Sequence, residues 1–140
     1  MTHYERLTRG ETNCNPGNID RNAIQWQGMA PVQKDPRFVV FVEPLYGIRA
    51  IGKVLLSYQE KHKLRTVRQI INRWAPSSEN NTDAYIEHVA ERMGVGPDDP
   101  IDVHDPDTME VLVRAIIKHE NDRVIYDDAL IVKAVDMALA

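Results

Sequence analysis

Apolar residues recur every three or four positions through most of the chain after Pro44. That period places the apolar side chains of each segment on one helical face, which packs on a core while the polar face meets water. Pro76 and Gly94 follow two of these segments, as expected where a helix ends. The pattern therefore predicts five helices, at about residues 46–62, 66–75, 81–93, 105–122 and 129–139.

The N-terminal third lacks this period and is rich in turn residues, among them an Asn-Pro-Gly-Asn turn. Its best strand candidate is FVVFV at 38–42, which is β-branched or aromatic throughout, and 23–27 is a second candidate. The two segments are predicted to pair as a small hairpin. The expected fold class is α+β but mostly α, in one domain over residues 1–140, with 1–8 as a flexible N-terminal tail.

Composition narrows the class of protein further. The chain has 140 residues, 43% of them hydrophobic and 27% charged, which suits one soluble domain with a real core. A net charge of -4 and a pI near 5.7 argue against a nucleic-acid partner, and no apolar run is long enough to suggest a membrane span. The single cysteine, Cys14, excludes an internal disulfide. The N-terminus has no apolar signal-peptide core, so we expect synthesis in a cytoplasm.

The segment 105–122 carries the candidate chemistry. Its apolar positions lie on one helical face: Met109, Leu112, Val113, Ile116 and Ile117. Glu120 is the next position on that face, in the negative last turn of the predicted helix. Partial burial and the helix dipole both raise the pKa of a carboxyl group in this place. A carboxyl group that stays protonated near neutral pH is what a general acid requires, although a solvated residue at the helix end is the alternative.

Several stretches of the chain together resemble a family of small phage and prophage proteins. They are RGETNCNPGNI at 9–19, WQG at 26–28, FVVFVEPLYGIRA at 38–50, IINRWAPSSENNTDAYI at 70–86 and AIIKHEN at 115–121. The family pattern reads roughly R-G-x-R-N-N-N-P-G-N-I, F-x-x-x-x-x-G-I-R-A, W-A-P-x-x-E-N-x-T-x-x-Y and h-E-N-G. Its members are labelled virion structural proteins or lysozyme-like endolysins. The chain departs from the pattern at Thr12, Cys14 and Asp122, the last of which stands where glycine is usual.

The resemblance implies a lysozyme-like peptidoglycan hydrolase. In the lysozyme-superfamily glucosaminidases, which the middle of the chain also resembles, the catalytic glutamate ends a hydrophobic helix that precedes the hairpin. Here the helix of that type comes last, so a circularly permuted arrangement is expected, with Glu120 as the general acid. Glu79 is the candidate second carboxylate, with helix entry as its structural alternative, and Glu11 is a third choice for a catalytic carboxyl group.

Six further residues are candidates for contact with a glycan. They are Asn15, Asn18, Tyr46, Arg49, Trp74 and Tyr85. Aromatic and arginine side chains suit the wall of a sugar-binding cleft, but aromatic residues at helical spacing also serve as core residues. The two asparagines have a second interpretation as residues that close the turn around Pro16.

No metal or organic cofactor is implied, since the histidines show no paired ligand spacing and no Gly-rich phosphate loop is present. The expected reaction is cleavage of the β-1,4 glycan strand of peptidoglycan, in the periplasm or cell wall or as part of a phage virion. A second carboxylate facing Glu120 favours a muramidase or glucosaminidase, and the lack of one favours a lytic transglycosylase. The rival hypothesis is a non-catalytic virion structural or assembly protein, whose partners are other virion proteins.

Overall fold

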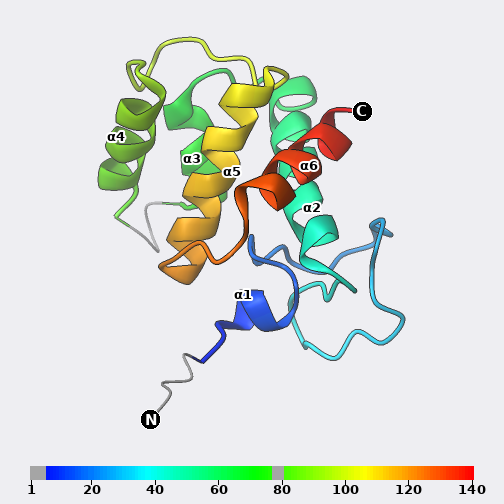
Figure 1. The fold of residues 1–140 in the computed structure, drawn as a ribbon. Helices are drawn as coiled ribbons and strands as arrows, with labels where there is room; N and C mark the ends of the chain where they lie inside the picture. Colours follow the sequence, from blue (N-terminus) through cyan, green and yellow to red (C-terminus); the bar gives the residue numbers. More distant parts are fainter. Residues whose placement is uncertain (1–5, 77–80) are drawn as a thin grey trace.

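The structure is a computed structural model that describes residues 6–76 and 81–140. Most of these residues are helical, which confirms the mostly α class (Figure 1). The helices are α1 (Arg9–Thr12), α2 (Pro44–Glu60), α3 (Val67–Trp74), α4 (Thr82–Met93), α5 (Pro106–Asn121) and α6 (Asp128–Leu139). The five predicted helices correspond to α2 to α6, and their ends lie within two residues of the prediction. None of the described helices combines the length and apolar character needed to cross a membrane.

α2 is the helix on which α5 and α6 pack, as Figure 1 shows. Pro44 fits its first position, where a backbone N–H has no intrahelical partner. A Cβ added to Gly52 would lie 2.6 Å from the Ala138 Cβ and 3.0 Å from the Met109 Sδ. The glycine therefore lets α2, α5 and α6 converge in the core.

α5 buries the predicted apolar face completely: Met109, Leu112, Val113, Ile116 and Ile117. Asp105 is the N-cap residue but caps no backbone N–H with its side chain; its carboxylate accepts from the Thr108 hydroxyl instead. The helix ends at Asp122, whose φ of 62° is a left-handed conformation that favours glycine. Lys118 Nζ donates to the Asp122 carbonyl oxygen at 2.6 Å, which helps a non-glycine residue to hold this conformation.

α1 is a single turn that the hydrophobic pattern does not predict, because its residues are mostly polar. It is held by a capping box: the Glu11 N–H donates to the Thr8 hydroxyl, and the Thr8 N–H donates to the Glu11 carboxylate. Thr8 falls within the segment expected to be a flexible tail, yet it caps this helix. Residues 1–5 of that segment lie outside the described residues.

The predicted β-hairpin is not confirmed. Within the described ranges, the segment 38–42 makes isolated bridges and no continuous ladder. Phe38 pairs with Asp20, and Phe41 pairs with Met29. The segment is extended, as its β-branched and aromatic residues favour, but it meets two different loops in place of one partner strand.

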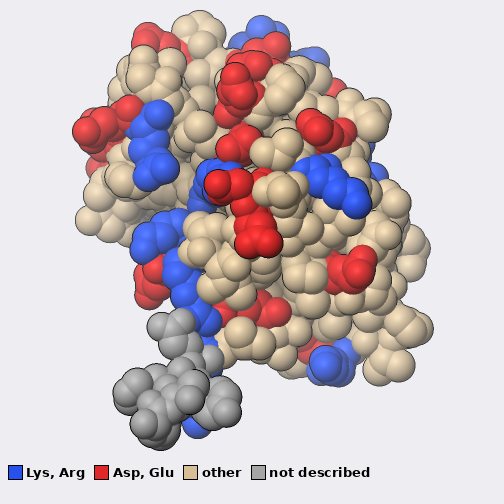
Figure 2. Space-filling model, viewed as in Figure 1, with Lys and Arg blue, Asp and Glu red and all other residues tan. Residues whose placement is uncertain are grey.

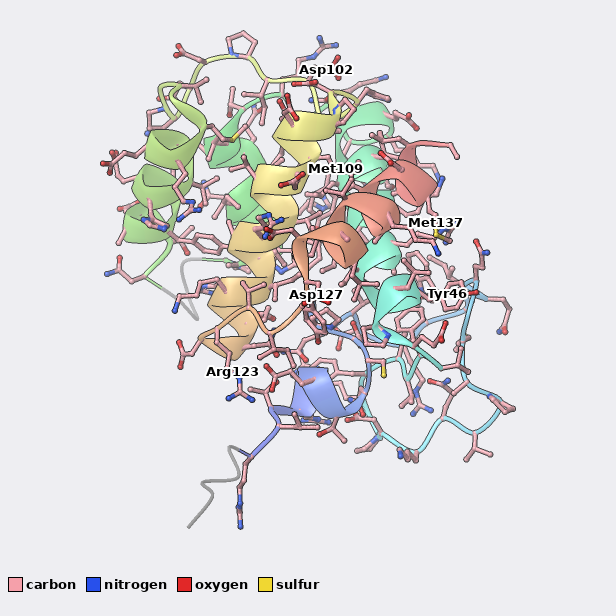
Figure 3. The ribbon with its side chains drawn as sticks, viewed as in Figure 1. Tyr46, Asp102, Met109, Arg123, Asp127 and Met137 are labelled. Carbon is pink, nitrogen blue, oxygen red and sulfur yellow. The ribbon has the colours of Figure 1, made fainter. Side chains whose placement is uncertain are left out.

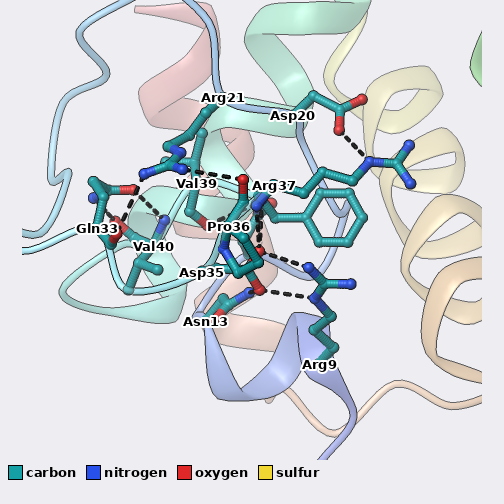
Figure 4. Close-up of polar contacts among 12 residues, drawn as sticks. Arg9, Asn13, Asp20, Arg21, Gln33, Asp35, Pro36, Arg37, Val39 and Val40 are labelled. Carbon is teal, nitrogen blue, oxygen red and sulfur yellow. Dashed lines mark hydrogen bonds and ion pairs between the residues drawn. The ribbon is translucent and has the colours of Figure 1, made fainter.

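Side chains make several of the hydrogen bonds to the backbone of the segment 38–42 that a partner strand would otherwise make (Figure 4). Gln33 Oε1 accepts from the Val40 N–H, and Gln33 Nε2 donates to the Val40 carbonyl oxygen, both at 2.8 Å. The Asp35 carboxylate accepts from the Phe38 N–H at 2.8 Å and from the Arg9 guanidinium at 2.7 Å. The hydrogen bond from Arg9 has the largest effect on the pKa of Asp35, and the bond from the Phe38 N–H follows. These bonds hold the pKa of Asp35 well below its usual range. The loop at 33–40 is thus held by charge and amide contacts.

Candidate functional site

A cleft with a volume of about 1010 Å³ opens between the N-terminal loops and the helices. Its walls come from the turn and loop at 17–27, residues 37–38, one face of α2, the end of α3 and the end of α5. The lining side chains that bear on chemistry and binding are Asn18, Asp20, Trp26, Arg37, Arg49, Trp74 and Glu120. The cleft therefore brings together residues from five separate parts of the chain.

The turn at 15–18 lies directly against the start of α2. A Cβ on Gly47 would collide with the Cys14 carbonyl oxygen, and one on Gly17 would lie 2.7 Å from the Ile51 Cγ1. Glycine at both positions lets the turn and the helix approach closely. The NPGNI and GIRA motifs consequently form adjoining walls of the cleft.

Glu120 lies in the last turn of α5, with its side chain half-buried on the wall of the cleft. Asn18 Nδ2 donates a long hydrogen bond of 3.5 Å to Glu120 Oε1. Burial is the largest influence on the pKa of Glu120 and raises it; Asn18 and Arg37 lower it by less, and Asp20 adds a small rise. The net direction is upward, which keeps this carboxyl group protonated closer to neutral pH than an ordinary glutamate.

The two asparagines of the turn have different environments. Asn15 is fully buried and lies outside the cleft; its Nδ2 donates to the carbonyl oxygens of Ile19 and Val39, and its Oδ1 accepts from the Ile19 N–H. The two bonds to Ile19 close the turn, and the bond to Val39 ties the turn to the segment 38–42. Asn18 lines the cleft with a φ of 49°, and its buried Oδ1 has no hydrogen-bond partner among the described residues. Asn18 is therefore the asparagine whose amide reaches Glu120.

Asn121, the residue after Glu120, ties α5 to the turn. Its Nδ2 donates to the carbonyl oxygens of Pro16 and Ile117, at 2.8 and 2.9 Å. Its Oδ1 accepts from the Thr8 hydroxyl at 2.6 Å. These contacts hold the end of α5 in one position relative to the turn. They give the Glu-Asn pair of the AIIKHEN motif a physical role, which is to hold Glu120 beside the residue that bonds it.

A buried ion pair supports this junction. The Glu11 side chain is 1% exposed and accepts two hydrogen bonds from the Arg123 guanidinium, at 2.9 and 2.5 Å. Figure 3 shows Arg123 directly after the end of α5. Its guanidinium, together with hydrogen bonds from Thr8, holds the pKa of Glu11 below its usual value. Glu11, the third choice for a catalytic carboxyl group, does not line the cleft and is occupied by this ion pair.

Two of the predicted aromatic contacts also lie away from the cleft lining. Tyr46, in the first turn of α2, packs its ring over Gly28, whose φ is 77° (Figure 3). Tyr85 is buried on α4 and stacks on His119, with ring centroids 4.2 Å apart. Tyr85 thus packs against the residue that precedes Glu120, on the side of α5 that faces α4.

Arg49 and Trp74 both line the cleft. Trp74, at the end of α3, is half-buried, and its ring meets Tyr58 edge-on with centroids 6.1 Å apart. Its Cζ2 also lies 3.2 Å from the position of a Cβ on Gly17. One part of the indole therefore packs against the protein while another part borders the cleft.

This placement predicts a mixed effect for Trp74→Ala. The free energy of unfolding should fall by about 2 kcal/mol, less than the roughly 3–5 kcal/mol lost at a fully buried tryptophan, and binding to a glycan should weaken. Thermal denaturation and co-sedimentation with purified cell walls measure the two effects, with Trp74→Phe as the variant that keeps a ring. Unchanged stability would contradict the packing role, and unchanged binding would contradict the role in the cleft.

Asp20 is a cleft residue that the sequence pattern missed. It directly follows the NPGNI turn, and its carboxylate accepts from Arg37 Nε at 2.7 Å (Figure 4). Its place next to a recognised motif was the available signal. Glu79, the predicted second carboxylate, lies outside the described residues. Among the residues that are described, no group of three or more His, Cys, Asp and Glu side chains has an arrangement that suits a metal ion.

Protein P5 of Pseudoalteromonas phage PM2 is similar to this chain. The two sequences are 35% identical over 123 residues, which cover 86% of this chain and 75% of P5. No family model matches the chain. The likeness to P5 covers most of both proteins, so it concerns the domain as a whole.

Proposed function

The chain belongs to the family of Protein P5 of Pseudoalteromonas phage PM2, and on that premise we propose that it cleaves the glycan strands of bacterial peptidoglycan, with Glu120 as the general acid. A phage meets the peptidoglycan layer when it enters and when it leaves its host, so a wall-cleaving protein suits a phage gene product. The lysozyme-like, circularly permuted arrangement expected from the motifs is part of the same proposal.

One observation carries the proposal: a half-buried carboxyl group with a raised pKa stands on the wall of an open cleft of about 1010 Å³. A structural glutamate in this place would be covered by a neighbouring ring such as Tyr85 or Tyr126. Neither tyrosine is among the residues that line the cleft around Glu120. Glu120 itself does line the cleft, which supports a role at a ligand site.

In the proposed reaction, Glu120 donates its proton to the glycosidic oxygen as the bond to the sugar breaks and an oxocarbenium-like state develops. The proton has to be on the carboxyl group before the bond breaks, which is why the raised pKa matters. Asn18 then bonds the carboxylate that forms, since its Nδ2 already points at Oε1. An amide donor at this position favours the charged form after proton transfer.

The second half of the reaction depends on what attacks the sugar. Asp20 lies on the same cleft and is a candidate for orienting water, in addition to Glu79. Attack by water produces a new reducing end and makes the protein a glycoside hydrolase. Attack by the muramic 6-hydroxyl within the same sugar produces an anhydro end and makes it a lytic transglycosylase. The two products differ in mass by one water.

The proposal is tested by incubating the purified protein with purified peptidoglycan and following the loss of turbidity. We expect wild-type protein to solubilise the wall, and heat-inactivated protein and buffer serve as controls. No solubilisation over a range of pH and ionic strength would refute catalysis. The chain would then be a virion structural or assembly protein that keeps an open cleft without using it for bond cleavage.

A further inference from the structure

A row of cationic side chains lies along the cleft face of α2. Arg49, Lys53 and Lys61 are separated by multiples of four residues, with Ser57 between the last two, and all four line the cleft. Residues four apart lie above one another on a helix. Since each residue rises 1.5 Å, the row extends over about 18 Å. We call Arg49, Lys53 and Lys61 the α2 rail.

The rail has no counter-charge among the described residues: no hydrogen bond or ion pair joins its three side-chain cations to another described group. The other cations of the cleft are engaged. Arg37 pairs with Asp20 at 2.7 Å, and the Arg73 guanidinium lies 5.4 Å from the centre of the Tyr58 ring. The rail cations are thus the ones on the cleft wall that no described side chain engages.

This concentration of positive charge in the cleft contrasts with the charge of the chain as a whole. The chain has a net charge of -4, yet the cleft is lined by five Lys and Arg side chains and only two Asp and Glu side chains. On the face shown in Figure 2, basic and acidic side chains are interspersed. An acidic protein that gathers unpaired cations in its cleft is suited to an anionic ligand, because the local field attracts one there.

Resting on the proposed function, we propose that the α2 rail binds the carboxylate groups of the stem peptides along a peptidoglycan strand and so selects peptidoglycan over a neutral polysaccharide such as chitin. The lactyl ethers of alternate sugars are amide-linked to the stem peptides, and these peptides carry the free carboxylates. Cationic side chains at intervals along one wall meet such groups as charge-assisted hydrogen bonds. Trp26 and Trp74 border the same cleft and offer apolar ring surface to the sugars.

A single-stranded nucleic acid is the other polymer that basic and aromatic side chains together can bind. Proteins of that kind usually show a basic excess, because most of their affinity comes from phosphate contacts. This chain is acidic overall, with a net charge of -4, so it lacks the basic excess that extensive phosphate contacts require. The charges therefore favour a glycan whose anionic groups are sparse along the strand.

The test compares two triple variants with equal changes in charge. The rail variant carries Arg49→Gln, Lys53→Gln and Lys61→Gln. The control variant carries Arg65→Gln, Arg92→Gln and Lys133→Gln, which are exposed positions outside the cleft lining. Both are made in a Glu120→Gln background so that digestion does not consume the ligand. Binding is measured by co-sedimentation with purified cell walls and with chitin, and by fluorescence anisotropy with a single-stranded DNA oligonucleotide.

We expect each rail cation to contribute about 2–5-fold to cell-wall affinity, the range of an exposed ion pair, and the triple rail variant to lose about 10–100-fold. The loss should shrink at high salt because the contacts are screened. The control variant and all chitin binding should be unchanged. Equal cell-wall binding by the two triple variants, or an equal loss on chitin, would overturn the inference. Rail-dependent binding of the oligonucleotide that is tighter than cell-wall binding would also overturn it.

This experiment separates the inference from the proposed function. Rail-dependent binding to cell walls by a protein that cleaves no bond would support the rail and refute catalysis. Wall cleavage by a wild-type protein whose binding does not depend on the rail would support catalysis and refute the rail.

Discussion

Glu120→Gln is expected to lower the rate of peptidoglycan cleavage by about 10²–10⁴-fold, the usual contribution of a positioned general acid. Glutamine keeps the size of the side chain and the contact with Asn18, but it carries no proton that the leaving oxygen can take. The rate is measured as new chain ends per unit time on purified peptidoglycan. Glu87→Gln, the same chemical change at an exposed position of α4, is the matched control and should leave the rate unchanged.

The pH dependence carries a second signature of Glu120. Its pKa is raised, and the acid acts only while protonated, so wild-type activity should fall as pH rises through that pKa. The residual activity of Glu120→Gln should lack this alkaline limb. The raised pKa also makes the free energy of unfolding depend on pH. Folded Glu120 holds its proton at a pH where the unfolded chain has lost it, so its contribution to stability falls as pH rises through this range. Glu120→Gln should therefore keep or slightly raise the melting temperature at neutral pH.

A wild-type rate for Glu120→Gln would show that Glu120 is not the acid, and Glu79 and then Asp20, the other carboxyl residue on the described cleft wall, would be the next residues to test. A loss of activity accompanied by unfolding would not support the assignment. Circular dichroism and the melting temperature of each variant are thus part of the experiment.

Arg123→Met is expected to lower the free energy of unfolding by about 3–5 kcal/mol, because it leaves a buried carboxylate without its counter-charge. Glu11 has 1% of its side chain exposed and takes two hydrogen bonds from Arg123, whose side chain is 25% exposed. Chemical denaturation at neutral pH measures the loss. Arg68→Met, which removes an exposed pair with Asp98, is the control and should cost at most about 1 kcal/mol.

The double variant Arg123→Met with Glu11→Gln should recover most of the loss, since it removes the stranded charge. The pH dependence has a definite sign. The pKa of Glu11 is lowered in the folded state, so its contribution to stability is present above the unfolded value and is lost as pH falls toward the folded pKa. Arg123→Met should abolish this acid-side loss. Equal stability of the Arg123→Met and wild-type proteins would contradict a stabilising role for the pair.

The helices and the apolar face of α5 were predictable because both are encoded by spacing within one segment. The raised pKa of Glu120 followed from the same local reasoning: the residue continues an apolar face into the last turn of the helix. These features depend on residues that are near in sequence or are marked by a motif.

Features that depend on pairing across the fold were not predictable. Arg123 and Glu11 are 112 positions apart, and neither residue type reveals its partner in the sequence. The predicted hairpin is not confirmed for a related reason: the segment 38–42 bonds to two separate loops, and the Gln33 and Asp35 side chains bond backbone groups of Val40 and Phe38. Asp20 was missed because a single aspartate after a turn is common. Its importance appears only when the fold brings it into the cleft that Glu120 borders.

We propose that the protein breaks a glycosidic bond in peptidoglycan with the proton of Glu120. The decisive measurement is mass spectrometry of the fragments that wild-type protein releases from purified peptidoglycan, alongside those released by an equal amount of folded Glu120→Gln. We expect disaccharide-peptide fragments cut at the β-1,4 bond, with hydrated or anhydro ends, from the wild type and about 10²–10⁴-fold fewer from the variant. Fragments cut only within the stem peptides, or equal yields of glycan fragments from the two proteins, would contradict it.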